Sequence, residues 1–338
     1  MIELKQDNLV FSFPEVHKEA ELHIDFERTL RIPDDGKRHA LPPGLGSFPL
    51  RHVDDFAEKV PRNWLEHGGV MLPMYQSEAL WLNFCGFMSS AYPFAVKIAT
   101  GKINALTGKE WKNGLNRRPQ DYVVVPDQPW LDGYCVKKGE IRQFVAMPLG
   151  AGYSAEEQIT GKAEYGGIQI IAYPMKAEAY ELLRRSYESV RYYAQDASMV
   201  PTAAGASLDM GLAPGGRMRQ KIYDDPHDFD VWDLEHASRC FVHIANSLVW
   251  RAITGQAPPT VPPTAKEYTD AGLPWFDLYD EQVAALGGAE ELADLKSVKE
   301  LGEEKGDVPL PENESVDPQN VKKLRHGLRK DQVREGVF

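Results

Sequence analysis

Between residues 69 and 171 the chain is divided into short apolar segments, and each segment ends at Gly, Pro, Asn or Asp. Segments of this length and composition predict β-strands. An alternating apolar and polar pattern over Leu22–Ile32 predicts a further long strand with one solvent-exposed face. For Ser77–Phe87 periodicity does not decide, although Glu78-Ala79-Leu80 favours a helix. The expected strands are Val70–Tyr75, Ala91–Ala99, Lys102–Leu106, Asp121–Val125, Tyr134–Val136, Arg142–Met147 and Gly167–Tyr173.

Helical spacing of apolar residues dominates the next part of the chain and predicts helices over Lys176–Gln195, Asp233–Ile253 and Asp280–Leu301. Because the strands cluster before the helices, the sequence predicts an α+β fold. We expect a strand-rich, mostly antiparallel half over 1–173 and a helix-rich half over 174–301. Together they form one large globular unit over 1–301, followed by an extended charged tail over 302–338.

The tail lacks apolar periodicity from Asp307 to Phe338, contains Pro309, Pro311 and Pro318, and is densely charged with both signs. A segment of this composition buries too little apolar surface to offset its own ordering entropy. Such a tail most commonly becomes ordered by lying on another surface, often that of a second copy. The sequence therefore predicts a homo-oligomer in which the tail packs on a neighbouring subunit.

The formal net charge of −12 and the pI of about 5.3 disfavour bulk electrostatic binding to nucleic acid or to an anionic membrane. The three cysteines, Cys85, Cys135 and Cys240, are far apart, which favours a reducing compartment. No segment resembles a signal peptide or approaches the roughly 20 apolar residues of a membrane helix. We therefore expect a soluble, cytoplasmic protein with no nucleic-acid partner and no membrane.

The densest basic segment before the tail lies in the glycine-rich stretch 211–221. Gly215 and Gly216 would let backbone amides approach an anion, and Arg217, Arg219 and Lys221 would add charge-assisted donors. This predicts a site for a small anionic ligand. The alternative is a flexible loop whose basic side chains pair with the acidic run downstream.

That acidic run holds Asp224, Asp225, His227, Asp228 and Asp230. Clustered carboxylates are the ligands that hard divalent cations require, so the run is a candidate metal site. The alternative is an exposed loop before a helix, with Asp230 or Asp233 as its N-cap. No other cofactor is predicted.

Two further patterns have structural alternatives. His236, Cys240 and His243 are spaced to share one helix face, where they would either contact zinc or pack on the core. The run Ser154-Ala155-Glu156-Glu157 fits a capping box at a helix start.

The sequence contains no Walker A loop, no GxGxxG after a strand and no GxSxG motif. It therefore favours a non-catalytic assembly or interaction protein that forms a homo-oligomer. The alternative is an enzyme acting on a small anionic substrate bound at 211–221 beside the acidic run 224–233.

Overall fold

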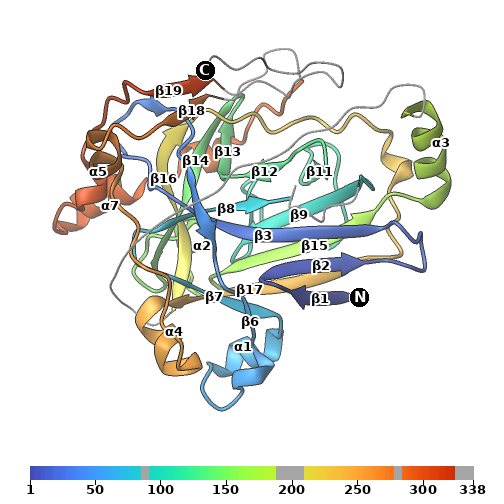
Figure 1. Cartoon of the computed structure of the whole chain (residues 1–338), viewed down its shortest axis with the longest axis horizontal. Helices are drawn as coiled ribbons and strands as arrows, with labels where there is room; N and C mark the ends of the chain where they lie inside the picture. The colour runs from blue at the N-terminus through green and yellow to red at the C-terminus, as the bar shows by residue number, and fades with distance from the viewer. Residues whose placement is uncertain (85–90, 188–208, 278–283, 324–338) are drawn as a thin grey trace, which may run out of the picture.

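The structure, a computed structural model, describes residues 1–84, 91–187, 209–277 and 284–323. Within these residues two large β-sheets form the body of the molecule, and short helices lie around its edges (Figure 1). Strands make up 36% of the structure and helices 19%.

The first sheet has ten strands in the order β1-β2-β3-β8-β14-β16-β4, with β5 beside β3, β12 beside β8 and β13 beside β14. Its neighbouring strands are antiparallel except β16 and β4, which run parallel. The strands are β1 Ile2–Lys5, β2 Asn8–Ser12, β3 Glu21–Thr29, β4 Arg38–His39, β5 Gly44–Ser47, β8 Ala79–Asn83, β12 Trp130–Leu131, β13 Gly133–Lys137, β14 Glu140–Pro148 and β16 Met210–Met218.

The second sheet has seven strands in the order β10-β9-β15-β17-β7-β6, with β11 beside β9. Only β17 and β7 run parallel in it. Its strands are β6 Arg51–His52, β7 Val70–Met74, β9 Phe94–Thr100, β10 Ile103–Asn104, β11 Val123–Val125, β15 Ile168–Pro174 and β17 Ser238–Asn246. A small third sheet pairs β18 Trp275–Asp277 with β19 Val321–Lys323.

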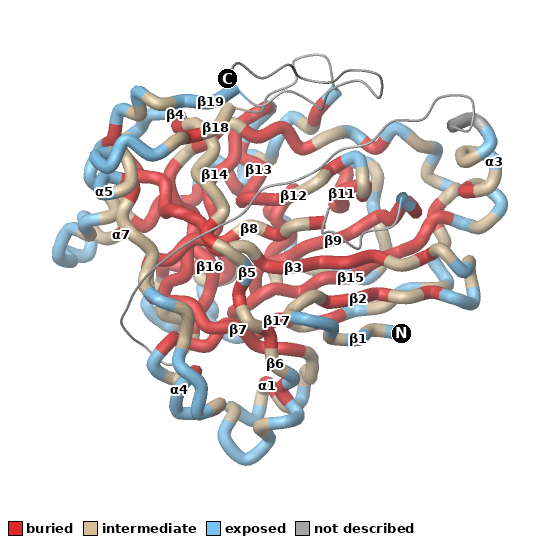
Figure 2. Tube along the Cα trace, in the orientation of Figure 1, coloured by how far each residue is buried: buried red, intermediate tan, exposed pale blue. Residues whose placement is uncertain are grey.

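The two large sheets contribute buried apolar side chains to one shared core, including Phe26 from β3, Leu80 from β8 and Ile170 from β15. Figure 2 shows that the strands are mostly buried while the helices are largely exposed. The helices are α1 Arg62–His67, α2 Ala155–Thr160, α3 Ala177–Tyr187, α4 Ser247–Thr254, α5 Ala265–Asp270, α6 Glu290–Ala293 and α7 Val298–Lys305, with 3₁₀ turns at Asp54–Phe56, Phe229–Val231 and Pro311–Asn313.

The prediction of a helix-rich half over 174–301 is wrong, and its largest error is the helix expected over Asp233–Ile253. Ser238–Asn246 is instead strand β17, which lies between β15 and β7 in the second sheet. A strand that is buried on both faces reads as a continuous apolar run, so its pattern resembles that of a buried helix. The helix α4 begins only at Ser247, where the Asn246 side chain accepts a hydrogen bond from the Leu248 amide.

Strand β16, Met210–Met218, occupies most of the glycine-rich stretch 211–221 that the sequence suggested to be a loop. Its glycines permit close packing inside a sheet. A Cβ atom added to Gly215 would lie 2.5 Å from Val145 Cγ2, and one added to Gly216 would lie 2.5 Å from the Pro33 carbonyl oxygen. The glycines therefore admit neighbouring chain segments here, at positions where we expected them to admit a ligand.

Other predicted elements had mixed outcomes. Ala79–Asn83 is strand β8 and not part of a helix, because it pairs with β3 and β14. The helix expected over Asp280–Leu301 is replaced by the short α6 and α7. Helix α3 and the capping box of α2 are confirmed as far as the described residues reach. Residues 188–195 and 280–283 of the predicted helices lie outside the described residues.

The described part of the predicted tail packs on its own chain. Val316 is buried, and β19 pairs with β18. The Ser315 hydroxyl donates to Asp35 Oδ2 at 2.6 Å, and Arg31 donates to Asn313 Oδ1 at 2.7 Å. Residues 324–338 lie outside the described residues, and the division into a unit over 1–301 and a tail stays a prediction.

Candidate functional site

Three arginines lie side by side on three neighbouring strands of the first sheet. Arg142 of β14 is opposite Arg217 of β16, and Arg217 is in register with Arg38 of β4. Neighbouring strands are only about 4.8 Å apart, so the three side chains start close together. Like charges facing each other across strands are destabilising, and this row therefore requires negative charge nearby.

Glu140 supplies the first negative charge and is shared by three cations. Its carboxylate lies 3.0 Å from Lys137 Nζ, 3.5 Å from Arg38 Nε and 3.7 Å from Arg217 Nη1. The Glu140 side chain is only 2% exposed. One buried carboxylate thus contacts three basic side chains, and its single negative charge cannot neutralise all three.

Glu300 of α7 supplies the second negative charge, with its Oε2 3.4 Å from Arg142 Nη1. Burial alone would raise the pKa of Glu300, but hydrogen bonds from Ser297 and the charge of Arg142 hold that pKa below its usual range. Glu300 is therefore ionised at neutral pH. We refer to Arg38, Lys137, Arg142 and Arg217 as the basic cluster. Its four cations face two carboxylates, Glu140 and Glu300, so two positive charges remain.

Two further buried groups, Asp34 and Arg31, lie beside the basic cluster and outside its ion pairs. Burial raises the pKa of Asp34, although the positive charges of Arg142 and Arg31 oppose that rise. Arg31 is buried too, and Asp34 and Glu312 are the acidic groups that act on it. Arg31 therefore lies between two acidic groups, Glu312 and Asp34, and cannot neutralise both.

The basic cluster is open to solvent on one side. The side chains of Arg38, Lys137 and Arg217 are 57%, 58% and 37% exposed, whereas Arg142 is 4% exposed. Among the described residues, Arg142 Nε and Nη1 have no hydrogen-bond partner. Three donor groups are therefore accessible to a ligand, and the fourth positive charge, on Arg142, is buried.

The structure separates the residues that the sequence grouped as an anion site. Arg217 joins the basic cluster, but Arg219 Nη1 lies 3.4 Å from Asp277 Oδ1 and Lys221 is buried. Gly215 and Gly216 lie inside β16. Sequence reasoning missed Arg38, Lys137 and Glu140, because strand pairing alone brings them to Arg217.

The acidic run does not gather its carboxylates around one point. Asp225 faces inward, where its Oδ2 accepts hydrogen bonds from Tyr122 Oη at 2.6 Å and Trp232 Nε1 at 3.0 Å. Asp224, Asp228 and Asp230 are exposed, and His227 is half-buried. In the described ranges no group of three or more His, Cys, Asp or Glu side chains is arranged to hold a metal ion.

His236, Cys240 and His243 do not share a helix face, because the last two lie on strand β17. His243 Nε2 is 2.9 Å from the Gly68 carbonyl oxygen, and His236 Nδ1 is 2.8 Å from Asp233 Oδ2. Burial raises the pKa of the Cys240 thiol to about 12, so the thiol is protonated at neutral pH in the metal-free protein. The zinc alternative therefore loses its geometric basis.

As far as the described residues show, no helix is long and apolar enough to span a bilayer. The chain matches no protein-family model, no curated protein and no solved structure.

Proposed function

We propose that the protein binds a phosphoryl dianion, either inorganic phosphate or the phosphate group of a larger molecule, at the basic cluster. The observation that carries this proposal is the sharing of one buried carboxylate, Glu140, by three partly exposed cations. The two positive charges left over match the charge that a phosphoryl group carries near neutral pH. Arginine also presents paired N–H groups that fit two oxygens of one phosphate.

The proposed role is binding without catalysis. Glu140 and Glu300 are held by cations and serve as counter-charges, so neither is placed as a general acid or base. The alternative of an enzyme acting at 211–221 loses support, because Asp225 of the neighbouring acidic run is occupied by Tyr122 and Trp232.

The homo-oligomer, the tail on a neighbouring subunit and the cytoplasmic location stay predictions, as does a divalent metal at the acidic run. The packing of residues 307–323 on their own chain removes one reason for the assembly proposal. Deletion of 303–338 tests it directly, since an unchanged oligomeric mass in light scattering would contradict it.

The phosphate proposal is tested by isothermal titration with sodium phosphate at low ionic strength. Replacing Arg217 by glutamine should weaken binding about tenfold, since a hydrogen bond to a charged group contributes about 1.5 kcal/mol or more. Arg62→Gln is the matched control, because Arg62 is an exposed arginine paired with Glu66 on α1.

Glu140→Gln gives the opposite expectation. It removes the shared carboxylate and leaves the cluster with one more positive charge, so phosphate should bind more tightly than to the wild type. Circular dichroism checks that the variant is folded. If it is not, the double variant Arg38→Gln with Lys137→Gln replaces it and should lose binding. Equal affinities in the wild type and Arg217→Gln would contradict the proposal.

A further inference from the structure

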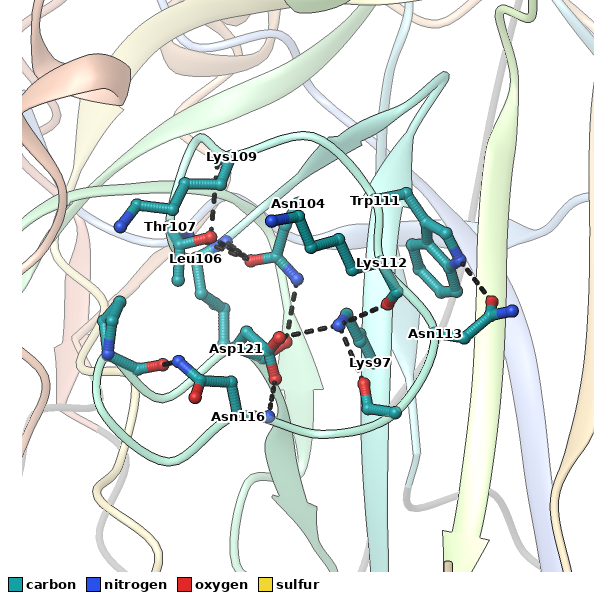
Figure 3. A network of polar contacts seen from close by, with 12 residues as sticks. Lys97, Asn104, Leu106, Thr107, Lys109, Trp111, Lys112, Asn113, Asn116 and Asp121 are labelled. Carbon is teal, nitrogen blue, oxygen red and sulfur yellow. Dashed lines mark hydrogen bonds and ion pairs between the residues drawn. The ribbon is translucent and has the colours of Figure 1, made fainter.

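A long loop, residues 105–121, is built around one buried ammonium group (Figure 3). Lys97 of β9 donates to the Lys112 carbonyl at 2.8 Å, to the Gly114 carbonyl at 2.9 Å and to Asp121 Oδ2 at 2.6 Å. The Lys97 side chain is 3% exposed, so its charge is used entirely inside the protein. Because three acceptors from the loop converge on it, Lys97 fixes the path of the loop.

Asn104 fixes the start of the same loop. Its Oδ1 accepts hydrogen bonds from the Leu106 and Thr107 amides, each at 3.0 Å, and its Nδ2 donates to the Asp121 carbonyl at 2.8 Å. Asp121 Oδ1 in turn accepts from the Asn116 amide at 2.8 Å. Both ends of the loop are therefore tied to one network, as Figure 3 shows.

This loop forms the wall of a hollow of about 750 Å³. That volume falls in the range of small-molecule sites. Lys109, Lys112 and Arg118 line it, together with the carboxylates of Glu110 and Glu291. All of these residues except Glu291 belong to the loop that Lys97 and Asn104 fix, so the backbone of this wall is set before any ligand arrives, whereas the charged side chains themselves are exposed.

The basic side chains at the hollow differ from that of Lys97, because they have no acceptor or ion-pair partner among the described residues. Within the described ranges, the side chains of Lys109, Lys112 and Arg118 make no hydrogen bond or ion pair, although Glu110 and Glu291 lie in the same lining. Three cations and two carboxylates leave one positive charge. The lining thus balances a ligand that carries a single negative charge.

The uncharged groups around the hollow are polar. Asn113 Oδ1 accepts from Trp111 Nε1 at 3.3 Å and from Arg239 Nη2 at 2.7 Å, which orients the amide. Its Nδ2 makes no hydrogen bond to the described residues, and amide groups of this kind pair with hydroxyl groups. Leu115 and Ile159 are the larger apolar side chains of the lining.

We propose that this hollow is a second binding site, for a small hydroxylated carboxylate such as a sugar acid. Lys112 and Arg118 contact the carboxylate, and the Asn113 amide contacts hydroxyl groups. A ligand of this class differs from the phosphoryl dianion proposed for the basic cluster, and the two sites share no residue.

The test is isothermal titration of the full chain with sodium D-glucuronate, sodium D-gluconate and D-glucose at millimolar concentration. We expect a sugar acid to bind and neutral glucose to bind at least about tenfold more weakly, because it lacks the charged partner. The double variant Lys112→Gln with Arg118→Gln should lose at least about tenfold in affinity for the sugar acid. Both substitutions lie on the surface and leave the Lys97 network in place.

Two controls separate this site from the basic cluster and from general charge effects. Lys18→Gln changes an exposed lysine elsewhere and should bind the sugar acid as the wild type does. Arg217→Gln should weaken phosphate binding alone. The proposal is overturned if neither sugar acid binds, if glucose binds equally well, or if the double variant keeps its affinity.

Discussion

The basic cluster and the loop around Lys97 are both built on a buried charge, but they use it in opposite ways. At Lys97 one cation receives three acceptors, namely Asp121 and two carbonyl groups, and nothing is left over. At Glu140 one anion receives three cations, and two positive charges remain on the surrounding side chains once Arg142 and Glu300 are included. The number of partners around a buried ion therefore separates a charge that holds the fold from charges that are available to a ligand.

The largest effect is expected at Lys97. Lys97→Met leaves the Asp121 carboxylate and two carbonyl groups without their shared donor, and breaking a buried pair costs about 3–5 kcal/mol. Urea unfolding measures the loss, and limited proteolysis within 105–121 shows whether the loop opens. A loss below about 1 kcal/mol would mean that Lys97 does not hold the loop.

Asp132 is a third buried group, and unlike Lys97 and Glu140 it has no ion-pair partner among the described residues. It accepts a hydrogen bond from Trp130 Nε1 and is fully desolvated, which raises its pKa to about 7. Between about pH 4 and pH 7 the folded state keeps a proton that the unfolded state has lost, so stability falls as the pH rises.

Asp132→Asn removes this dependence. Relative to the wild type, the variant should gain about 3 kcal/mol in unfolding free energy between pH 4.5 and pH 8. Urea unfolding at the two pH values measures this difference. A parallel loss of stability in both proteins would place the titration elsewhere.

A smaller effect is expected at Arg217, where the charge serves a ligand. Arg217→Gln should change the unfolding free energy by less than about 1 kcal/mol, because its partner Glu140 keeps Lys137 and Arg38. Phosphate should nevertheless raise the melting temperature of the wild type more than that of the variant. An equal shift in both proteins would show that the stabilisation arises away from the cluster.

The smallest effect is expected for the exposed pair Arg62–Glu66, at 3.0 Å on α1. Its side chains are 91% and 61% exposed, so Arg62→Gln should cost less than about 0.5 kcal/mol and leave phosphate binding unchanged. Thermal unfolding and titration measure both. A larger loss of unfolding free energy would mean that the exposure of an ion pair does not predict its contribution to stability in this protein.

Sequence patterns predicted many short strands because turn residues and apolar runs are local signals. They failed at β17, where burial on both faces removes the alternation that marks a strand. They suggested Arg217 as an anion-binding residue, which stays a prediction, but they did not indicate its neighbours Arg38, Lys137 and Glu140. Local composition does not reveal the register between strands that are distant in the sequence.

One local signal for the second site was present in the sequence. Lys97 is the only charged residue in the apolar run 91–99, and a lysine in a buried strand requires partners. The partners could not be named beforehand, because they are carbonyl groups whose position depends on how the loop folds back.

The packing of residues 313–315 on the segment between β3 and β4 has a consequence for the order of events during synthesis. Arg31 and Asn313 are separated by 282 residues, and the Asp35–Ser315 contact by 280. A ribosome that adds about 5–20 residues per second needs roughly 15–60 s to bridge that interval. During that time Arg31, which is buried in the finished protein, lacks its hydrogen-bond acceptor Asn313. The segment around Arg31 and Asp35 therefore cannot complete its native contacts until residues 313–315 have been synthesised.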